Sequence, residues 1–282
     1  MNRKHYMAND YKILCEEADK ISRANGRIKE SSNGYQVLET YHDKGSNFKG
    51  VLYYRNGEYA IAFAGTDKWS AKDHGANLKM AVSGNSRQIK DAQKFTKDMK
   101  VKYGLDNTNT VSLGHSEGGT EATLVGINNG FPTVTFNAYG VGAKMDEKNA
   151  YNDLVINYRD PHDPVSKLKE NVGETFIVPD GKYSGANPLG AIKAHGIGNM
   201  GDCGNAIPVK DYKKENRFFI DKISDADISR KDIGSMSTDL YRVYEKEIDK
   251  RMESGRIKSS GSNGGDEGNW VTINGNHVLI KS

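Results

Sequence analysis

The sequence predicts an α/β fold in which a mostly parallel central sheet is flanked by helices. Between Val111 and Tyr158, short apolar runs that suit buried strands alternate with a helical stretch, a rhythm typical of parallel sheets. The first of these runs leads through a glycine-framed serine directly into a helix. Acidic residues and a histidine follow later strands, at the sheet edge where α/β proteins place functional groups.

Composition sets the outer bounds on this interpretation. A chain of 282 residues can bury one sizeable core and carry appendages. Its 40 basic and 37 acidic residues give a formal charge of +3, and this near balance gives no support to a nucleic-acid partner. The two cysteines, Cys15 and Cys203, indicate neither a disulfide framework nor a zinc site.

The sequence also indicates where in the cell the protein is expected. No apolar run approaches the length of a membrane span, and the basic N-terminus lacks the apolar stretch of a cleavable signal peptide. We therefore expect a cytoplasmic protein in the producing cell. Association with a virion or export by a specialised system stays open.

The N-terminal part combines one helix with a strand and a hairpin. Residues 6–23 have apolar side chains at helical spacing. Residues 35–41 read as a strand. Two further β-rich runs, 48–54 and 58–63, flank Asn56-Gly57, a pair that favours a type I′ turn.

The middle of the chain supplies helices and the remaining strands. Residues 69–80 and 86–103 are expected to be helical, the second with a buried face of Ile89, Ala92, Phe95 and Met99. Strands are expected at 133–138, 154–158 and 176–179, followed by a loop at 181–190.

The chain is organised around Gly114-His115-Ser116-Glu117-Gly118, which fits G-x-S-x-G between an apolar strand and a helix. In this context the serine sits on a strained turn, and the glycines keep side chains away where strand and helix approach closely. The helix N-terminus behind the serine favours developing negative charge. The pattern predicts that Ser116 is a nucleophile.

The residues after the serine supply candidates for an acid and a base. Asp160 and Asp163 share the loop after the strand at 154–158, and both stay open as the acid on position alone. His195, on an expected glycine-flanked loop after the last strand, is the candidate base. His162 lies too close in sequence to the acid, and His277 lies in a separate tail. The order serine, acid, histidine is that of α/β-hydrolases.

Two further segments could complete such a site. Gly65-Thr66 ends an early strand, where an acyl hydrolase takes a backbone N–H donor for the oxyanion. The segment after it could cover the site as a lid, with Trp69, Leu78 and Met80 contacting lipid and nearby lysines meeting anionic head groups. The alternative is a helix packed on the sheet, with Trp69 in the core.

The glycine-framed serine, the run Ala62-Phe63-Ala64-Gly65-Thr66 and the run His162-Asp163-Pro164-Val165 together resemble the class 3 (fungal-type) lipases and their bacterial relatives. The resemblance covers roughly residues 35–200. It implies an α/β-hydrolase fold and hydrolysis of acyl esters in lipids. By position it implies that Ser116 is the nucleophile, Asp163 the acid and His195 the base, with Thr66 and Glu117 as oxyanion-hole residues.

Two departures from that family concern the substrate more than the fold. Ala64 stands where an arginine is frequent, and Glu117 replaces the usual apolar residue after the serine. Only the backbone N–H of Glu117 is required. Its carboxylate must point away from an oxyanion.

The C-terminal part predicts a separate appendage. We expect an α/β-hydrolase domain with a C-terminal helical extension over 1–258, including a helix at 239–256, then a flexible linker at 259–269 and a hairpin tail at 270–282. The tail resembles a short segment of bacteriophage minor head proteins and polymorphic toxins. That resemblance implies a phage or secretion-system partner.

These observations predict a serine hydrolase of the lipase or phospholipase A type, which needs no metal or cofactor. Its expected partners are a lipid or other acyl ester and, transiently, a membrane surface. One alternative is an esterase or thioesterase acting on small substrates. The other is a non-enzymatic phage-related structural or adaptor protein on a hydrolase fold.

Overall fold

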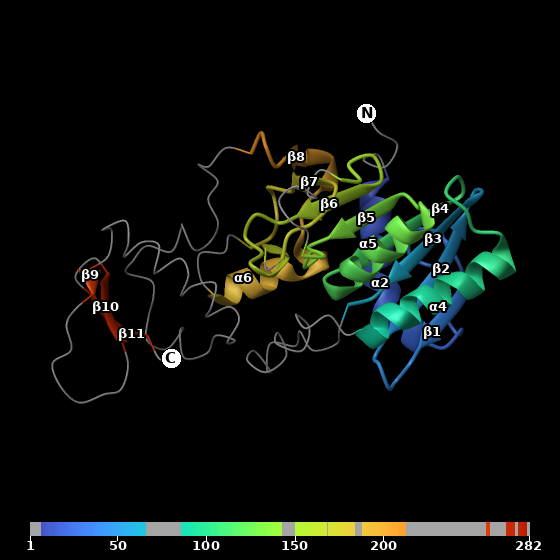
Figure 1. Ribbon diagram of the computed structural model, residues 1–282, viewed down its shortest axis with the longest axis horizontal. Coiled ribbons are helices and arrows are strands. Elements are labelled where there is room, and N and C mark those ends of the chain that lie inside the picture. Colours follow the sequence, from blue (N-terminus) through green and yellow to red (C-terminus); the bar gives the residue numbers. More distant parts are fainter. Residues whose placement is uncertain are drawn as a thin grey trace.

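The computed structural model describes residues 7–65, 86–142, 150–167, 169–183, 188–212, 258–259, 269–273 and 276–280. One sheet of eight strands runs through the larger part of the molecule, in the order β1 to β8 (Figure 1). The strands are β1 (Gln36–His42), β2 (Lys49–Arg55), β3 (Glu58–Phe63), β4 (Thr110–His115), β5 (Thr133–Phe136), β6 (Val155–Arg159), β7 (Glu174–Ile177) and β8 (Ile207–Pro208). The helices are α2 (Ala8–Arg23), α4 (Ser86–Tyr103), α5 (Glu117–Asn129) and α6 (Pro188–His195), with short 3₁₀ turns η1 (Val165–Lys167), η2 (Ile197–Asn199) and η3 (Cys203–Asn205).

The sheet is parallel in its centre and antiparallel at its two sides. The four pairings from β3 to β7 are parallel, whereas β1 with β2, β2 with β3 and β7 with β8 are antiparallel. The expected fold class, an α/β-hydrolase-like mostly parallel sheet flanked by helices, is confirmed. Asn56 and Gly57, both with positive φ (52° and 84°), form the expected turn between β2 and β3.

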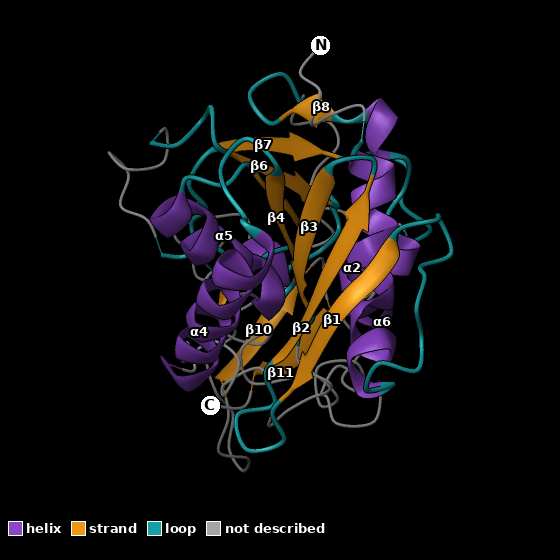
Figure 2. Ribbon diagram, turned by 90° about the vertical axis from the view of Figure 1, so that its right-hand side faces the viewer, coloured by secondary structure: helices purple, strands orange, loops and turns teal. Residues whose placement is uncertain are grey.

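The chain order explains which helix covers which face. Every parallel crossover moves in the same direction across the sheet, so right-handed connections place α4 and α5 on one face. Helix α2 precedes the sheet and covers the other face (Figure 2). Along β3, Ala60 and Ala62 join the core under α2, while Ile61 and Phe63 join the core under α4 and α5.

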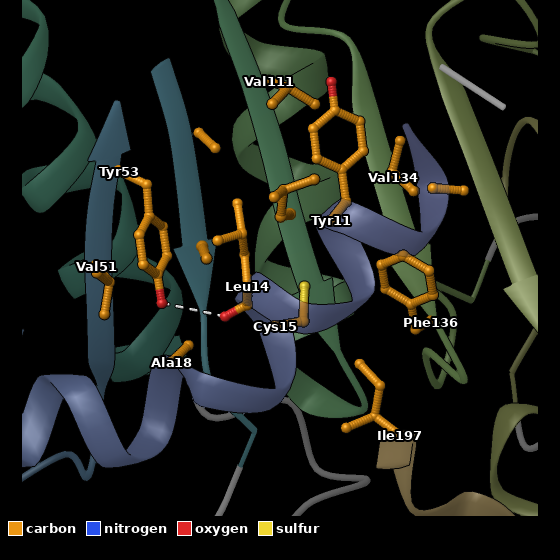
Figure 3. Packing of buried hydrophobic residues seen from close by; sticks show 14 of the residues in the cluster. Tyr11, Leu14, Cys15, Ala18, Val51, Tyr53, Val111, Val134, Phe136 and Ile197 are labelled. Carbon is orange, nitrogen blue, oxygen red and sulfur yellow. Dashed lines mark hydrogen bonds between the residues drawn. The ribbon is translucent and has the colours of Figure 1, made fainter. Parts of the chain in front are cut away.

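The core under α2 gathers residues from both ends of the domain (Figure 3). Leu14 and Cys15 of α2 pack there with Phe136 of β5 and with Ile197 of η2. The hydroxyl of Tyr53 donates to the main-chain oxygen of Leu14 at 3.1 Å, which satisfies a buried phenol. The N-terminal helix and the segment after α6 therefore belong to one packed layer.

Most expected elements occur within one or two residues of their predicted bounds, and the helix at 86–103 is confirmed. Two expectations are wrong: residues 188–190 of the loop expected at 181–190 are helical, and His195 ends a helix instead of lying on a loop. Helix α6 begins at Pro188 and ends at His195. Proline suits the first turn of a helix, and Ala191, Lys193 and Ala194 favour its continuation.

Several predictions fall on parts of the chain outside the described residues. These parts are 66–85, with Thr66 and the expected helix at 69–80, and 213–257, with the expected helix at 239–256. Within the described parts, the longest helices are too polar to cross a bilayer.

A second sheet lies at the C-terminal end of the sequence and has three antiparallel strands. They are β9 (Lys258–Ser259), β10 (Asn269–Ile273) and β11 (Asn276–Ile280). The pairing of Ile273 with Asn276 gives the hairpin expected around Asn274-Gly275. Ser259 and Asn269, the first and last residues of the expected linker, belong to the paired strands β9 and β10.

Candidate active site

Ser116 lies on the sharp turn between β4 and α5. Its backbone angles are φ 58° and ψ −124°, a conformation that costs a non-glycine residue free energy and is typical of functional turns. The turn depends on close backbone approach. A Cβ on Gly114 would lie 2.0 Å from the oxygen of Gly118, and a Cβ on Gly118 would lie 2.1 Å from the oxygen of Phe63. The expected elbow is therefore present, with glycine required on both sides of the serine.

A chain of hydrogen bonds connects three of the predicted residues. The Nε2 of His195 lies 2.8 Å from the Oγ of Ser116. The Nδ1 of His195 lies 3.0 Å from Oδ2 of Asp163. All three side chains are buried, with exposed fractions of 1%, 1% and 0% for Ser116, His195 and Asp163. The structure thus brings together β4, the loop after β6 and the end of α6.

The surroundings keep Asp163 ionised. Burial alone would raise the pKa of this carboxyl, but the charge of His195 and the hydrogen bonds from His195 and the Val165 N–H outweigh it. The pKa of Asp163 therefore lies below its usual value. The carboxylate can both orient the imidazole and stabilise its protonated form.

Asp160 occupies the same loop but a different position. Its Oδ1 accepts a hydrogen bond from the His162 N–H at 2.8 Å, and burial raises the pKa of its carboxyl to about 7. Among the described residues, nothing donates to its Oδ2. The structure therefore places Asp163, and not Asp160, against His195.

Asn137, which was not singled out in the sequence, joins the loop after β6 to the end of α6. Its side-chain Nδ2 donates to the main-chain oxygens of Ala194 and His195, both at 3.1 Å. Its Oδ1 accepts from the Asp160 N–H at 2.8 Å. The residue is fully buried and has φ 44°, which asparagine tolerates better than most residues. The signal in the sequence is an asparagine directly after a buried strand. It was missed because the expected strand, 133–138, includes Asn137.

His115 provides a second tie to the end of α6. Its Nε2 lies 2.8 Å from the main-chain oxygen of His195, and the two imidazole rings are 5.0 Å apart. Burial, and then the charge of His195, lowers the pKa of His115 to about 3. In the motif this residue had been only the variable position before the serine.

The structure describes Gly65 and Glu117 of the expected oxyanion site, but not Thr66. Gly65 lies beside Ser116, because a Cβ on Gly65 would be 3.2 Å from the Ser116 Cβ. Thr66 lies outside the described residues, as do the lid candidates Trp69, Leu78 and Met80. Glu117 is the first residue of α5, and its carboxylate acts on the buried carboxyl of Glu121, whose pKa is raised first by burial and then by this charge.

Comparison with known proteins gives a family for most of this region. Residues 24–196, more than half of the chain, match the phospholipase-like family described as the Tle-like phospholipase domain. The matched residues include Ser116, Asp163 and His195 but end before the C-terminal tail.

One curated relative is the extracellular phospholipase A1 of Serratia liquefaciens, which is 30% identical over 149 residues. This match spans 49% of the chain and 44% of the relative, so the chain matches less than half of that protein's length.

Solved structures of lipases are also similar. A triacylglycerol lipase from Penicillium expansum has 13% identity and a TM-score of 0.45, covering 71% of this chain and 81% of that one. Lipase II from Rhizopus niveus has 14% identity and a TM-score of 0.48, covering 63% and 82%.

Proposed function

The chain belongs to the Tle-like phospholipase family, and from this premise we propose that it is a serine hydrolase cleaving acyl esters of lipids, as a lipase or phospholipase A. The observation that carries the proposal is the hydrogen-bonded chain from Ser116 through His195 to Asp163. The name of the Serratia relative, a phospholipase A1, supports phospholipid as the substrate class.

The geometry suits a two-step acyl transfer. His195 takes the Ser116 proton through Nε2 as the Oγ attacks the ester carbonyl, and Asp163 stabilises the imidazolium through Nδ1. The protonated His195 then donates to the departing alcohol. A water molecule, activated by the same imidazole, releases the fatty acid and restores the serine.

The negative charge on the tetrahedral intermediate needs donors aimed at it. In this proposal the backbone N–H groups of Thr66, the residue after Gly65 in the sequence, and of Glu117, at the N-terminus of α5, supply them. Loss of one such donor typically lowers the rate by about 100- to 1,000-fold. The partial positive charge at the helix N-terminus acts in the same direction.

Access to Ser116 requires movement of the residues around it. The serine exposes 1% of its surface, so lipid must reach it through a rearrangement of its surroundings. We assign this role to a lid that includes Trp69, Leu78 and Met80, which would bring the site into transient contact with a membrane surface. The relative's description as extracellular supports action outside the producing cell.

The test compares Ser116→Ala with Ser32→Ala, a control at an exposed turn. The measurements are labelling by a fluorophosphonate and fatty-acid release from mixed phospholipids, followed by mass spectrometry. Ser116→Ala should abolish labelling and lower turnover by about 10⁴-fold or more, while Ser32→Ala should match the parent.

Other outcomes would favour other functions. Labelling of the parent without lipid turnover, together with hydrolysis of small esters or thioesters, would favour the small-substrate alternative. A folded parent protein that is neither labelled nor active would favour a binding or adaptor role on a hydrolase fold.

A further inference from the structure

A cavity of about 860 Å³ lies alongside β6, β7 and β8. Its charged lining is mainly basic and consists of Arg159, Lys167, Lys169, Lys210, Glu170 and Glu174. The four basic groups come from the end of β6, the loop between β6 and β7, and the residues after β8. This convergence places an excess of positive charge in one hollow.

Arg159 is the one of these four cations that belongs to a strand. It is the last residue of β6, is partly buried, and its Nε is enclosed without any hydrogen-bond acceptor among the described residues. Burial lowers the pKa of the guanidinium, and the charges of Asp163 and Glu170 offset only part of this effect. Arginine nevertheless stays protonated in proteins. The structure therefore holds the guanidinium charge at the cavity wall, and a ligand would meet its two terminal nitrogens, because the Nε itself has no exposed surface.

The wall of the cavity is tied to the candidate active site. The Nζ of Lys167 donates to the main-chain oxygen of Pro161 at 2.9 Å, within the loop that also carries Asp163. The charge of Arg159 acts on Asp163 in turn. A ligand held here would therefore sit against the back of the acid loop.

We propose that this cavity binds a phosphate group, with the Arg159 guanidinium as its principal contact. The planar fork of arginine matches the paired oxygens of a phosphate, and phosphate carries enough charge to balance several cations. The volume admits a phosphate ester as well as the free ion. The phosphate is either that of a phospholipid head group, a form that rests on the proposed function, or inorganic phosphate.

The experiment measures binding to the full-length chain, with Ser116→Ala added in the lipid arm so that no lipid is consumed. One arm titrates inorganic phosphate by calorimetry. The other measures sedimentation with phosphatidylglycerol vesicles, using vesicles of an uncharged glycolipid as reference. The variants are Arg159→Gln and Arg159→Lys, and Lys97→Gln on the exposed surface of α4 removes the same charge elsewhere.

Arg159→Gln should weaken phosphate binding at least tenfold, because a guanidinium contact to phosphate is charge-assisted and bidentate. The phosphate affinity of Arg159→Lys should lie between those of Arg159→Gln and the parent. The affinity of Lys97→Gln should equal that of the parent. If binding of both inorganic phosphate and the vesicles depends on Arg159, the site binds the lipid head group. If only the binding of inorganic phosphate depends on Arg159, the site binds the free ion.

The inference is overturned if neither ligand binds saturably, or if both bind equally well to the parent and to folded Arg159→Gln. Should Arg159→Gln fail to fold, Lys210→Gln at the exposed rim replaces it, with an expected loss of several-fold. These readouts need no turnover, so failure of the proposed hydrolase activity would be seen separately.

Discussion

The Nε2 of His115 lies 2.8 Å from the main-chain oxygen of His195, the candidate base. A carbonyl oxygen can only accept, so His115 carries its proton on Nε2. Because burial lowers the pKa of His115 to about 3, this residue is neutral from about pH 4 upward. The residue before Ser116 thus ties the elbow to the end of α6, which carries the candidate base.

His115→Phe keeps a ring against His195 but loses the donor, while His115→Gln keeps a donor of similar reach. We expect His115→Phe to lower kcat on a soluble ester by about 10- to 100-fold with little change in KM, since small misplacements of a catalytic group are costly. His115→Gln should recover part of that loss. Steady-state kinetics measures this, and a His115→Phe enzyme with the parent's kcat would contradict it.

Asp163→Asn should reduce turnover far more than Asp160→Asn. Asp163 contacts the Nδ1 of His195 at 3.0 Å, and an amide there misorients the imidazole, an effect of about 10⁴-fold in a comparable triad. Asp160 is connected to His195 through its main chain, by way of Asn137 and of Asp163, whose N–H donates to the Asp160 oxygen. Hydrolysis rates of the two folded variants decide this, and the opposite ranking would mean that the acid has been misassigned.

Asp160 should make stability depend on pH. Its pKa rises from the usual 3.8 to about 7 in the folded protein because it is buried. The carboxyl of Asp160 therefore stays protonated to a higher pH in the folded state than in the unfolded state. This stabilisation is complete below about pH 4 and is lost as the pH rises to about 7.

Asp160→Asn removes that titration while keeping an oxygen for the His162 N–H. The free energy of unfolding of Asp160→Asn, relative to that of the parent, should rise by a few kcal/mol between about pH 4 and pH 8. One pKa unit corresponds to about 1.4 kcal/mol. Urea unfolding at several pH values measures the difference. Asp211→Asn, at an exposed position, should show no such trend, and a pH-independent difference for Asp160→Asn would contradict the expectation.

The division into a hydrolase domain, a linker and a tail remains a prediction that truncation can test. Because β9 pairs with β10, the cut belongs after Ile257, so that the whole three-stranded sheet is removed. Ester hydrolysis and the unfolding temperature should stay close to those of the full chain. Loss of folding would show that the tail is part of the core.

The sequence by itself determined the fold class and the sharp turn that carries Ser116, the candidate nucleophile. The glycines around Ser116 are required by contacts of about 2 Å, and such a local steric demand is visible in the residue types themselves. The hairpin at Asn56-Gly57 and the helix at 86–103 were predictable for the same reason, since turn chemistry and helical periodicity act over a few residues.

Position alone left Asp160 and Asp163 open and the resemblance implied Asp163, but only the tertiary structure shows which of the two contacts His195. Both follow the same strand, and their roles depend on where α6 ends relative to that loop. The contributions of Asn137 and His115 were equally hidden, because each bonds to main-chain atoms near position 195, more than 50 residues away in sequence. Contacts of this kind depend on how the strands and α6 pack together, and no spacing in the chain encodes that packing locally.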